Sequence, residues 1–265
     1  MPSNSPKLWG PSDTYERYMG RWSRKVAPLF LEWLAAPEQQ RWVDIGCGTG
    51  ELTSQIIEKC RPSKAVGFDP SEGFVATARK LRCNAEFHVG SADQVDLTDG
   101  SVDIAVSGLV LNFVPDKAKA IGEMVRVVRA GGTVALYVWD YAGHMQIMRY
   151  FFDTANEFDP RSADYDDSIK APICRPMALR EAFDSSGLID VETTAIDIPT
   201  AFENFDDYWA PFLGGTGSAP KYCVSLDEST RTKIRDAIRA KLPTGPDGEI
   251  LLAARAWAVK GEVPN

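Results

Sequence analysis

One segment, Val43–Leu52, limits the possible folds of this chain more than any other. It reads Val-Asp-Ile-Gly-Cys-Gly-Thr-Gly-Glu-Leu, so a β-type run passes through three alternating glycines into a helical pattern. Glycine has no Cβ and accepts the backbone angles of tight turns. The first turn of a helix also offers free N–H groups to acceptor atoms. The segment predicts a strand, a tight turn and a helix whose backbone a ligand can approach closely.

The spacing of these glycines distinguishes between nucleotide-like ligands. A dinucleotide fingerprint, Gly-x-Gly-x-x-Gly, would need its third glycine where this chain has Glu51. No Gly-Lys-Ser or Gly-Lys-Thr follows the glycines, so a Walker-type phosphate loop is also absent from the sequence. Asp44 and Glu51 would repel a pyrophosphate but attract a ligand that carries an ammonium and a sulfonium. The turn argues against a nicotinamide dinucleotide and for a cationic ligand.

Between residues 41 and 140, short β-rich runs alternate with amphipathic stretches, which is the pattern of βαβ units around a parallel sheet. The pair Gly131-Gly132 is expected to end the third of the intervening helices and to lead into the fifth strand. We therefore predict an α/β fold with a Rossmann-like, doubly wound sheet. The first five expected strands are Arg41–Ile45, Ala65–Phe68, Ala85–Val89, Val102–Ser107 and Thr133–Trp139.

After Asp140 the sequence becomes less regular. Helical spacing predicts a helix over Met177–Ser186, and Ser225 with Glu228 has the spacing of a capping box at the start of another helix. Two further strands are expected, at Ile189–Ile198 and Ile250–Val259.

The expected domain organisation follows from these elements. Residues 1–40 are interpreted as an N-terminal helical cover, and residues 41–265 as one ligand-binding domain. Aromatic and acidic residues mix in two irregular stretches of that domain, at about 141–175 and 200–225, which we interpret as helical cap or lid insertions.

Charge and hydropathy exclude some partners. The net charge is −8, from 37 acidic and 29 basic residues, whereas duplex nucleic acid normally requires a concentrated basic surface. No apolar run approaches the roughly 18 residues of a membrane span, and Met1 to Gly10 are polar and interrupted by proline. The five cysteines form no close pair and only two histidines accompany them, so neither a disulfide framework nor a metal site is predicted. We expect a cytoplasmic protein without a nucleic-acid partner.

These motifs resemble those of the class I S-adenosylmethionine-dependent methyltransferases, particularly the small-molecule branch that includes quinone and trans-aconitate methyltransferases. The resemblance covers roughly Tyr15 to Asp140. It implies a sheet of about seven mostly parallel strands with the last strand antiparallel. It also implies S-adenosyl-L-methionine as cofactor and S-adenosyl-L-homocysteine as product.

The resemblance further implies roles for individual residues. The backbone around Gly46 and Gly48 would pack on the methionine part of the donor, and Asp69 would accept hydrogen bonds from the ribose hydroxyls. Asp93 would accept a hydrogen bond from the exocyclic amine of adenine. The candidate donor-binding residues are Tyr15, Arg21, Asp44, Gly46, Cys47, Gly48, Gly50, Asp69, Pro70, Ala92, Asp93, Ser107 and Gly108.

The acceptor side is less specific in sequence. A general base is needed only where the acceptor still carries its proton, and His144 is the candidate, with Tyr141, Asp140 or no base as alternatives. Aromatic residues are frequent in the two insertions, which suits an apolar or aromatic small-molecule acceptor, or alternatively supplies the insertions with a core of their own. Two other functions are considered: a non-catalytic protein that binds the donor, and a nicotinamide-dependent oxidoreductase.

Overall fold

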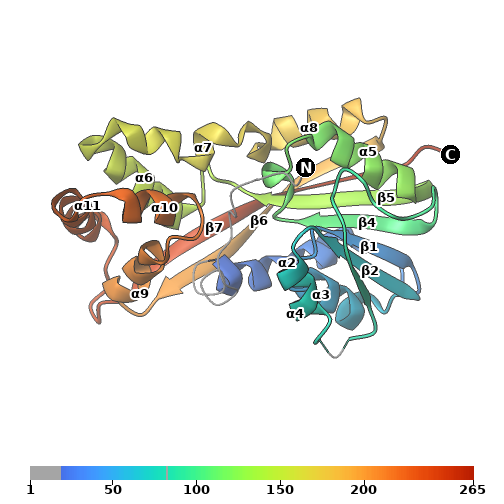
Figure 1. Ribbon diagram of the computed structural model, residues 1–265, viewed down its shortest axis with the longest axis horizontal. Coiled ribbons are helices and arrows are strands. Elements are labelled where there is room, and N and C mark those ends of the chain that lie inside the picture. The colour runs from blue at the N-terminus through green and yellow to red at the C-terminus, as the bar shows by residue number, and fades with distance from the viewer. Residues whose placement is uncertain (1–18, 82) are drawn as a thin grey trace. The chain divides into compact units, whose positions relative to one another are not determined.

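A computed structural model describes residues 19–81 and 83–265 (Figure 1). The chain divides into two compact units. We call the first, made of Arg24–Trp139, Ile173–Ile196 and Ala256–Asn265, the sheet unit. The second, made of Met1–Ser23, Asp140–Pro172 and Asp197–Arg255, is called the aromatic unit, and it is described from residue 19 onward.

A seven-stranded sheet with the order β3-β2-β1-β4-β5-β7-β6 organises the fold. The pairs β1–β2, β1–β4, β2–β3 and β4–β5 are parallel, and β7 runs antiparallel to β5. This confirms the predicted α/β class, the mostly parallel Rossmann-like sheet and its antiparallel last strand. The strands are β1 Arg41–Ile45, β2 Lys64–Asp69, β3 Glu86–Val89, β4 Val102–Gly108, β5 Val128–Trp139, β6 Ile189–Phe202 and β7 Ile250–Glu262.

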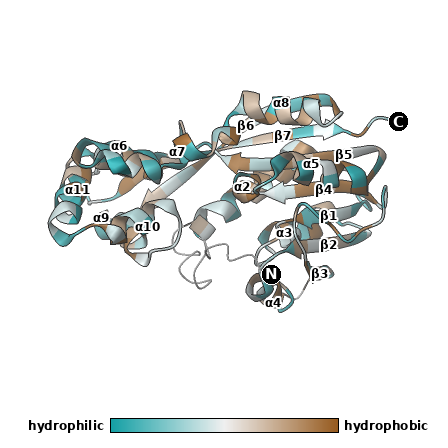
Figure 2. Cartoon of the chain, turned by 45° about the horizontal axis from the view of Figure 1, so that its top comes forward, coloured by the Kyte–Doolittle hydropathy of each residue, from teal (hydrophilic) through white to brown (hydrophobic). Residues whose placement is uncertain are grey.

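Helices cover both faces of the sheet unit (Figure 1). Helices α2, α3 and α4 lie on one face, and α5 and α8 lie on the other. Strands β1 and β4 are buried along almost their whole length, as parallel strands between two helical layers must be. Figure 2 shows hydrophobic colours along most of β4. The helices are α2 Arg21–Leu34, α3 Glu51–Cys60, α4 Glu72–Ala78, α5 Lys117–Val127 and α8 Pro176–Ser185, with a short 3-10 helix η2 at Leu111–Phe113.

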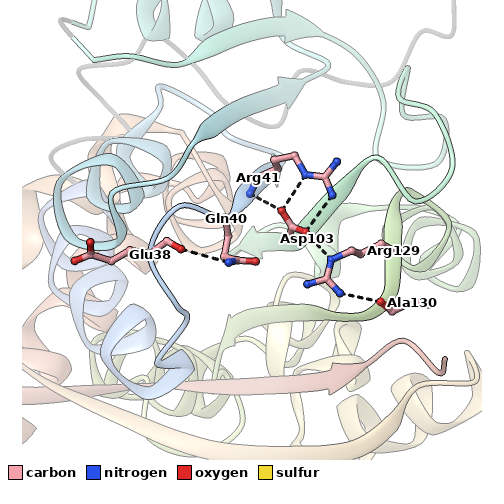
Figure 3. Close-up of polar contacts among 6 residues, drawn as sticks. All are labelled: Glu38, Gln40, Arg41, Asp103, Arg129 and Ala130. Atoms are coloured by element: carbon pink, nitrogen blue, oxygen red, sulfur yellow. Dashed lines mark hydrogen bonds and ion pairs between the residues drawn. The ribbon is translucent and has the colours of Figure 1, made fainter.

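An ion-pair network joins three strands of the sheet unit near their amino ends (Figure 3). The carboxylate of Asp103 on β4 accepts hydrogen bonds from the Arg41 backbone N–H (2.8 Å), Nε (2.9 Å) and Nη2 (3.0 Å) on β1. It also accepts one from Arg129 Nε (2.6 Å) on β5. These bonds, led by those from the Arg41 side chain, hold the pKa of Asp103 well below its ordinary range.

The aromatic unit has a core of stacked rings. Phe151 lies 4.5 Å from Phe212 in a parallel stack and 5.3 Å from Phe152 edge to face, measured between ring centroids. The buried Tyr208 hydroxyl donates to the Ile147 carbonyl at 2.9 Å. The elements are α6 Gln146–Phe158, η3 Pro160–Asp164, α7 Asp167–Lys170, η4 Pro172–Cys174, α9 Phe205–Trp209, η5 Ala210–Gly214, α10 Ser218–Ser225 and α11 Glu228–Lys241. Within the described residues, no helix combines the length and apolarity that crossing a membrane requires.

Two local predictions are wrong. Ser225 does not cap α11, because it still belongs to α10; the N-cap is Asp227, whose carboxylate accepts from the Thr230 backbone N–H at 2.9 Å. Gly131 does not end α5 either. That helix ends at Val127, because the buried, β-branched Val128 is already extended and pairs with Val102.

Candidate functional site

The glycine-rich turn follows β1 and leads into α3. Gly46, Gly48 and Gly50 have φ angles of +79°, +54° and +89°, values that side chains with a Cβ rarely adopt. A Cβ on Gly46 would lie 2.5 Å from a methyl carbon of Val110, so this position also lacks room. A Cβ on Gly48, by contrast, would meet no atom of the described residues within 4 Å. In the described part of the chain, the turn therefore leaves open space beside Gly48.

Asp69 ends β2 and binds the turn. Its Oδ2 accepts a hydrogen bond from the Gly48 backbone N–H at 3.0 Å, and its Oδ1 accepts one from the Ser71 N–H at 2.8 Å. Ser71 is the N-cap of α4, with its side chain accepting from the Phe74 N–H. Burial raises the pKa of Asp69, and the two backbone hydrogen bonds oppose this rise. One carboxylate thus links the glycine turn to the start of the next helix.

Asp44 lies beneath the turn and is 1% exposed. Its Oδ2 accepts a hydrogen bond from the Thr53 hydroxyl at 2.7 Å, while its buried Oδ1 has no hydrogen-bond partner in the described part of the chain. Burial raises the pKa of Asp44 to about 7, with a further rise from the charge of Asp69, whereas the Thr53 hydrogen bond lowers it. An incompletely satisfied carboxylate buried in this way suits a positively charged ligand group.

Cys47 occupies the middle of the turn, and its side chain is buried. A Cβ on Gly67 of β2 would lie 2.9 Å from the Cys47 Sγ, so β2 needs a glycine at this point. Burial, together with the nearby carboxylates of Asp44 and Asp69, raises the pKa of the Cys47 thiol far above its ordinary value. The thiol stays protonated at neutral pH.

The segment after β3 lies beside Asp69. The Gly90 backbone N–H donates to the Asp69 carbonyl at 3.1 Å, and the Ser91 hydroxyl donates to the carboxylate of Asp93. That hydrogen bond, with a smaller contribution from Lys119 at 3.8 Å, lowers the pKa of Asp93. Asp93 is therefore an ionised acceptor near the surface, and Ala92 beside it is half-buried.

Ser107 and Gly108 end β4 next to β1. The buried Ser107 hydroxyl donates to the Ile45 carbonyl at 2.7 Å, so it holds the two strand ends together. A Cβ on Gly108 would lie 2.6 Å from the Tyr137 hydroxyl oxygen, which leaves no room for a larger residue. These residues meet the glycine turn at the carboxyl ends of adjacent strands, where open α/β sheets bind their ligands.

The other candidates lie outside this cluster. Tyr15 lies outside the described residues. Arg21 belongs to the aromatic unit, where its Nη1 donates to Asp207 Oδ1 at 3.0 Å and its guanidinium carbon lies 4.3 Å and 4.7 Å from the ring centroids of Trp22 and Phe202. Its Nε and Nη2 atoms are buried and have no hydrogen-bond partner among the residues that the structure describes.

His144 also belongs to the aromatic unit. Its side chain is 54% exposed, and its Nδ1 lies 3.9 Å from Asp140 Oδ2. The same Asp140 carboxylate accepts hydrogen bonds from the backbone N–H groups of Gly143 and His144, both at 3.0 Å. Asp140 thus fixes the turn that carries the imidazole.

Sequence reasoning missed Thr53, Val110 and Tyr137. Val110 and Tyr137 come into contact with the glycines through tertiary packing, which no local pattern indicates. Thr53 gives a weak signal, because it is a polar residue on the apolar stripe of α3 beside Leu52 and Ile56, and all three are buried.

Comparison with known proteins identifies the class. Residues 43–136 match the family model described as a methyltransferase domain. The chain is 28% identical over 215 residues to a trans-aconitate 2-methyltransferase of Deinococcus radiodurans, covering 78% of this chain and 80% of the relative. It is 32% identical over 123 residues to a malonyl-[acyl-carrier protein] O-methyltransferase of Serratia marcescens, covering 46% and 47% of the two chains.

The solved structures agree in fold. A phosphoethanolamine N-methyltransferase 2 of Haemonchus contortus, in complex with phosphomonomethylethanolamine and S-adenosylhomocysteine, superposes with a TM-score of 0.59 at 15% identity. The superposition covers 96% of this chain and 57% of the other. The fold and the matched domain define a methyltransferase of the Rossmann-like class.

The chain is a methyltransferase with a Rossmann-like fold, and the methyl donor that its sequence resemblance implies is S-adenosylmethionine. The residues present fit this donor. Among residues 19–81 and 83–265, nothing fills the space above Gly48, one oxygen of the buried Asp44 has no hydrogen-bond partner, and each Asp69 oxygen accepts one hydrogen bond. An ionised carboxylate oxygen can accept about two, so Asp69 retains capacity for a diol.

Proposed function

We propose that this enzyme methylates a small-molecule acceptor and that it holds the donor over the carboxyl ends of β1, β2 and β4. The observation that carries the proposal is the contact between Asp69 and Gly48, which places a carboxylate with spare acceptor capacity at the edge of an open glycine turn. A ribose diol and a methionine chain need these two features side by side.

Each part of the donor has a matching group in this proposal. The buried carboxylate of Asp44 attracts the ammonium, and Asp69 with the adjacent Pro70 receives the ribose. Asp93 accepts from the adenine amine while Ala92 packs beside the ring. Gly46, Cys47, Gly48 and Gly50 form the floor under the methionine chain, and Ser107 and Gly108 form a wall.

The donor supplies a methyl group on a positively charged sulfur, so the protein needs to align the acceptor with it. Alignment alone contributes up to roughly 7–11 kcal/mol. Where the acceptor carries a proton, His144 is the proposed general base, and the Asp140 carboxylate lies 3.9 Å from its Nδ1. Tyr141, Asp140 itself or the absence of a base are the alternatives.

Arg21 favours an acidic group as one of the ligands. Its Nε and Nη2 atoms are the edge of the guanidinium that binds a carboxylate through two parallel hydrogen bonds, and both atoms lack a partner. The donor carries one carboxylate. The named acceptors of two relatives, trans-aconitate and a malonyl group, carry carboxylates too. We therefore infer that Arg21, with Tyr15 as a second candidate, binds a carboxylate of the donor or of the acceptor.

This gives two acceptor hypotheses. The large rings of Phe151, Phe212 and Tyr222 are buried in the core of the aromatic unit. They stabilise the fold of this unit, and their presence does not require an aromatic acceptor. Arg21 favours a small carboxylic acid that is converted to its methyl ester. An apolar or aromatic small molecule is the second candidate.

Two measurements test the proposal. Titration calorimetry with S-adenosylmethionine, S-adenosylhomocysteine and NAD should give binding of the two sulfur ligands and none of NAD. Transfer of labelled methyl to matched panels of carboxylic acids and of neutral aromatic compounds then identifies the acceptor class, and Arg21→Lys should impair transfer to acids only, if the acceptor supplies the carboxylate. Absence of binding to either sulfur ligand would refute the donor site.

A further inference from the structure

Thr53 and Asp44 form a buried pair that the roles above leave unexplained. Thr53 is the third residue of α3 and is completely buried, and Asp44 lies near the end of β1. The Thr53 Oγ1 donates to Asp44 Oδ2 at 2.7 Å. A helical threonine commonly bonds a carbonyl of the preceding turn of its own helix, but here its hydroxyl is directed to another element.

The rest of the surroundings of Asp44 is unfavourable to a negative charge. Asp69 contributes a second carboxylate nearby, and the thiol of Cys47 remains neutral. Within the described part of the chain, no ion pair joins Asp44 to a lysine, arginine or histidine, and its Oδ1 has no hydrogen-bond partner. Thr53 is thus the group that stabilises this carboxylate in its charged form.

We propose that Thr53 is a positioning residue for donor binding: its hydroxyl favours the charged form of Asp44 and fixes the orientation of this carboxylate, so that the carboxylate can attract the ammonium of the donor. This inference rests on the donor site proposed above. It adds that recognition of the methionine end depends on a residue that does not touch the donor.

The proposal separates two parts of the ligand. The hydroxyl affects only the charge proposed to face the amino-acid end of the donor. The affinity for ligands that lack this end should therefore not depend on Thr53. S-adenosylhomocysteine carries the ammonium, whereas 5′-methylthioadenosine has the same nucleoside but no amino-acid end. Comparing the two ligands distinguishes a positioning role from a general loss of folding.

The experiment uses the full-length wild-type protein with Thr53→Val and Thr53→Ser, and titrates each with both ligands by calorimetry between pH 5.5 and pH 8. We expect Thr53→Val to weaken the binding of S-adenosylhomocysteine about tenfold, which is the effect of losing a hydrogen bond to a charged group. The affinity for 5′-methylthioadenosine should stay unchanged. The pH below which S-adenosylhomocysteine affinity falls should also move upward, because the pKa of Asp44 loses its lowering hydrogen bond. Thr53→Ser should behave like the wild type.

Each other outcome has a definite meaning. Equal weakening of both ligands by Thr53→Val, or unchanged binding of both, would overturn the positioning role, and so would failure of serine to restore affinity. If Thr53→Val does not fold, Thr53→Ser against Thr53→Ala gives the same comparison with a smaller change in volume. A wild-type protein that binds neither ligand would instead refute the donor site itself.

Discussion

The backbone N–H of Gly48 donates to the Asp69 carboxylate at 3.0 Å, across two strand ends that are 21 residues apart in sequence. Because the carboxylate fixes the turn and is also the proposed acceptor for the ribose of the donor, removing Asp69 should affect both the position of the turn and the binding of the donor.

Asp69→Ala should weaken the binding of S-adenosylhomocysteine by more than tenfold, since the two proposed charge-assisted hydrogen bonds to the ribose are lost. Calorimetry measures this directly. Asp184→Ala is the matched control, because Asp184 is an exposed carboxylate on α8 that pairs only with Arg180 of the same helix. Equal affinities for the Asp69 and Asp184 variants would contradict the role of Asp69.

Gly48→Ala should abolish donor binding while the protein stays folded. The new methyl group would enter space that the protein leaves open and that the donor is proposed to occupy. Gly187→Ala carries the same backbone strain, because Gly187 also has a positive φ (+80°) and open surroundings. We expect both variants to lose roughly 1 kcal/mol of stability, and only Gly48→Ala to lose donor affinity. Normal binding by Gly48→Ala would place the donor elsewhere.

The buried Asp44 should make the ligand-free protein less stable as the pH rises from about 4 to about 7. Its folded-state pKa is raised to about 7, above the unfolded value of about 3.9. Over this range the folded protein retains a proton that the unfolded chain has released, so the free energy of unfolding falls with pH. Urea unfolding at pH 5 and pH 8 measures the difference, which should be smaller in Asp44→Asn. Identical pH dependence in both proteins would show that Asp44 is not responsible.

Asp103 should have the opposite effect at acid pH, where it makes the free energy of unfolding rise with increasing pH. Its pKa is lowered by Arg41 and Arg129, so its contribution is complete above the unfolded value and is lost as the pH falls below about 4. Asp103→Asn should cost roughly 2–3 kcal/mol at pH 7, through the loss of charge-assisted bonds. Chemical unfolding of wild type and variant at pH 7 and pH 3 should show that the cost has begun to decrease at pH 3, because the loss is complete only when the pH falls through the much lower pKa of the folded state. A cost that stays constant with pH would mean that packing, rather than charge, is responsible.

His144→Ala should lower the rate constant of methyl transfer about 100-fold, the lower end of the range for general-base catalysis, and leave the donor affinity unchanged. Steady-state kinetics with an identified acceptor measures the rate. His88→Ala is the control, since the other histidine is an exposed residue of β3 stacked on Phe68. An unchanged rate in His144→Ala would favour Tyr141, Asp140 or an acceptor that loses no proton in the reaction.

The central part of the fold could be predicted because local and tertiary preferences coincide there. The runs that became β1 and β4 are rich in apolar residues, including β-branched Val and Ile, as is typical of strands buried on both faces. Predictions failed where two local signals competed. Ser225 and Asp227 both favour a helix start, but α10 extends to Ser225, so Asp227 is the residue that caps α11.

The site was predicted to the extent that it is built from backbone. Glycines at positive φ and carboxylates after strands leave a pattern in sequence, so the turn and the position of Asp69 could be expected. The hydroxyl of Thr53, the methyl groups of Val110 and the ring of Tyr137 reach the site through packing of distant elements. Their chemical role depends on distances that a single sequence does not encode locally.

The buried thiol of Cys47 has a consequence for the durability of the enzyme. In the proposed donor site this sulfur would lie beside an alkylating reagent throughout the catalytic cycle, and a thiolate there would compete with the acceptor for the methyl group. Its pKa is raised so far by burial and by the carboxylates of Asp44 and Asp69 that the nucleophilic form is essentially unpopulated at neutral pH. The same negative charges that attract the donor therefore also protect the turn from methylating itself.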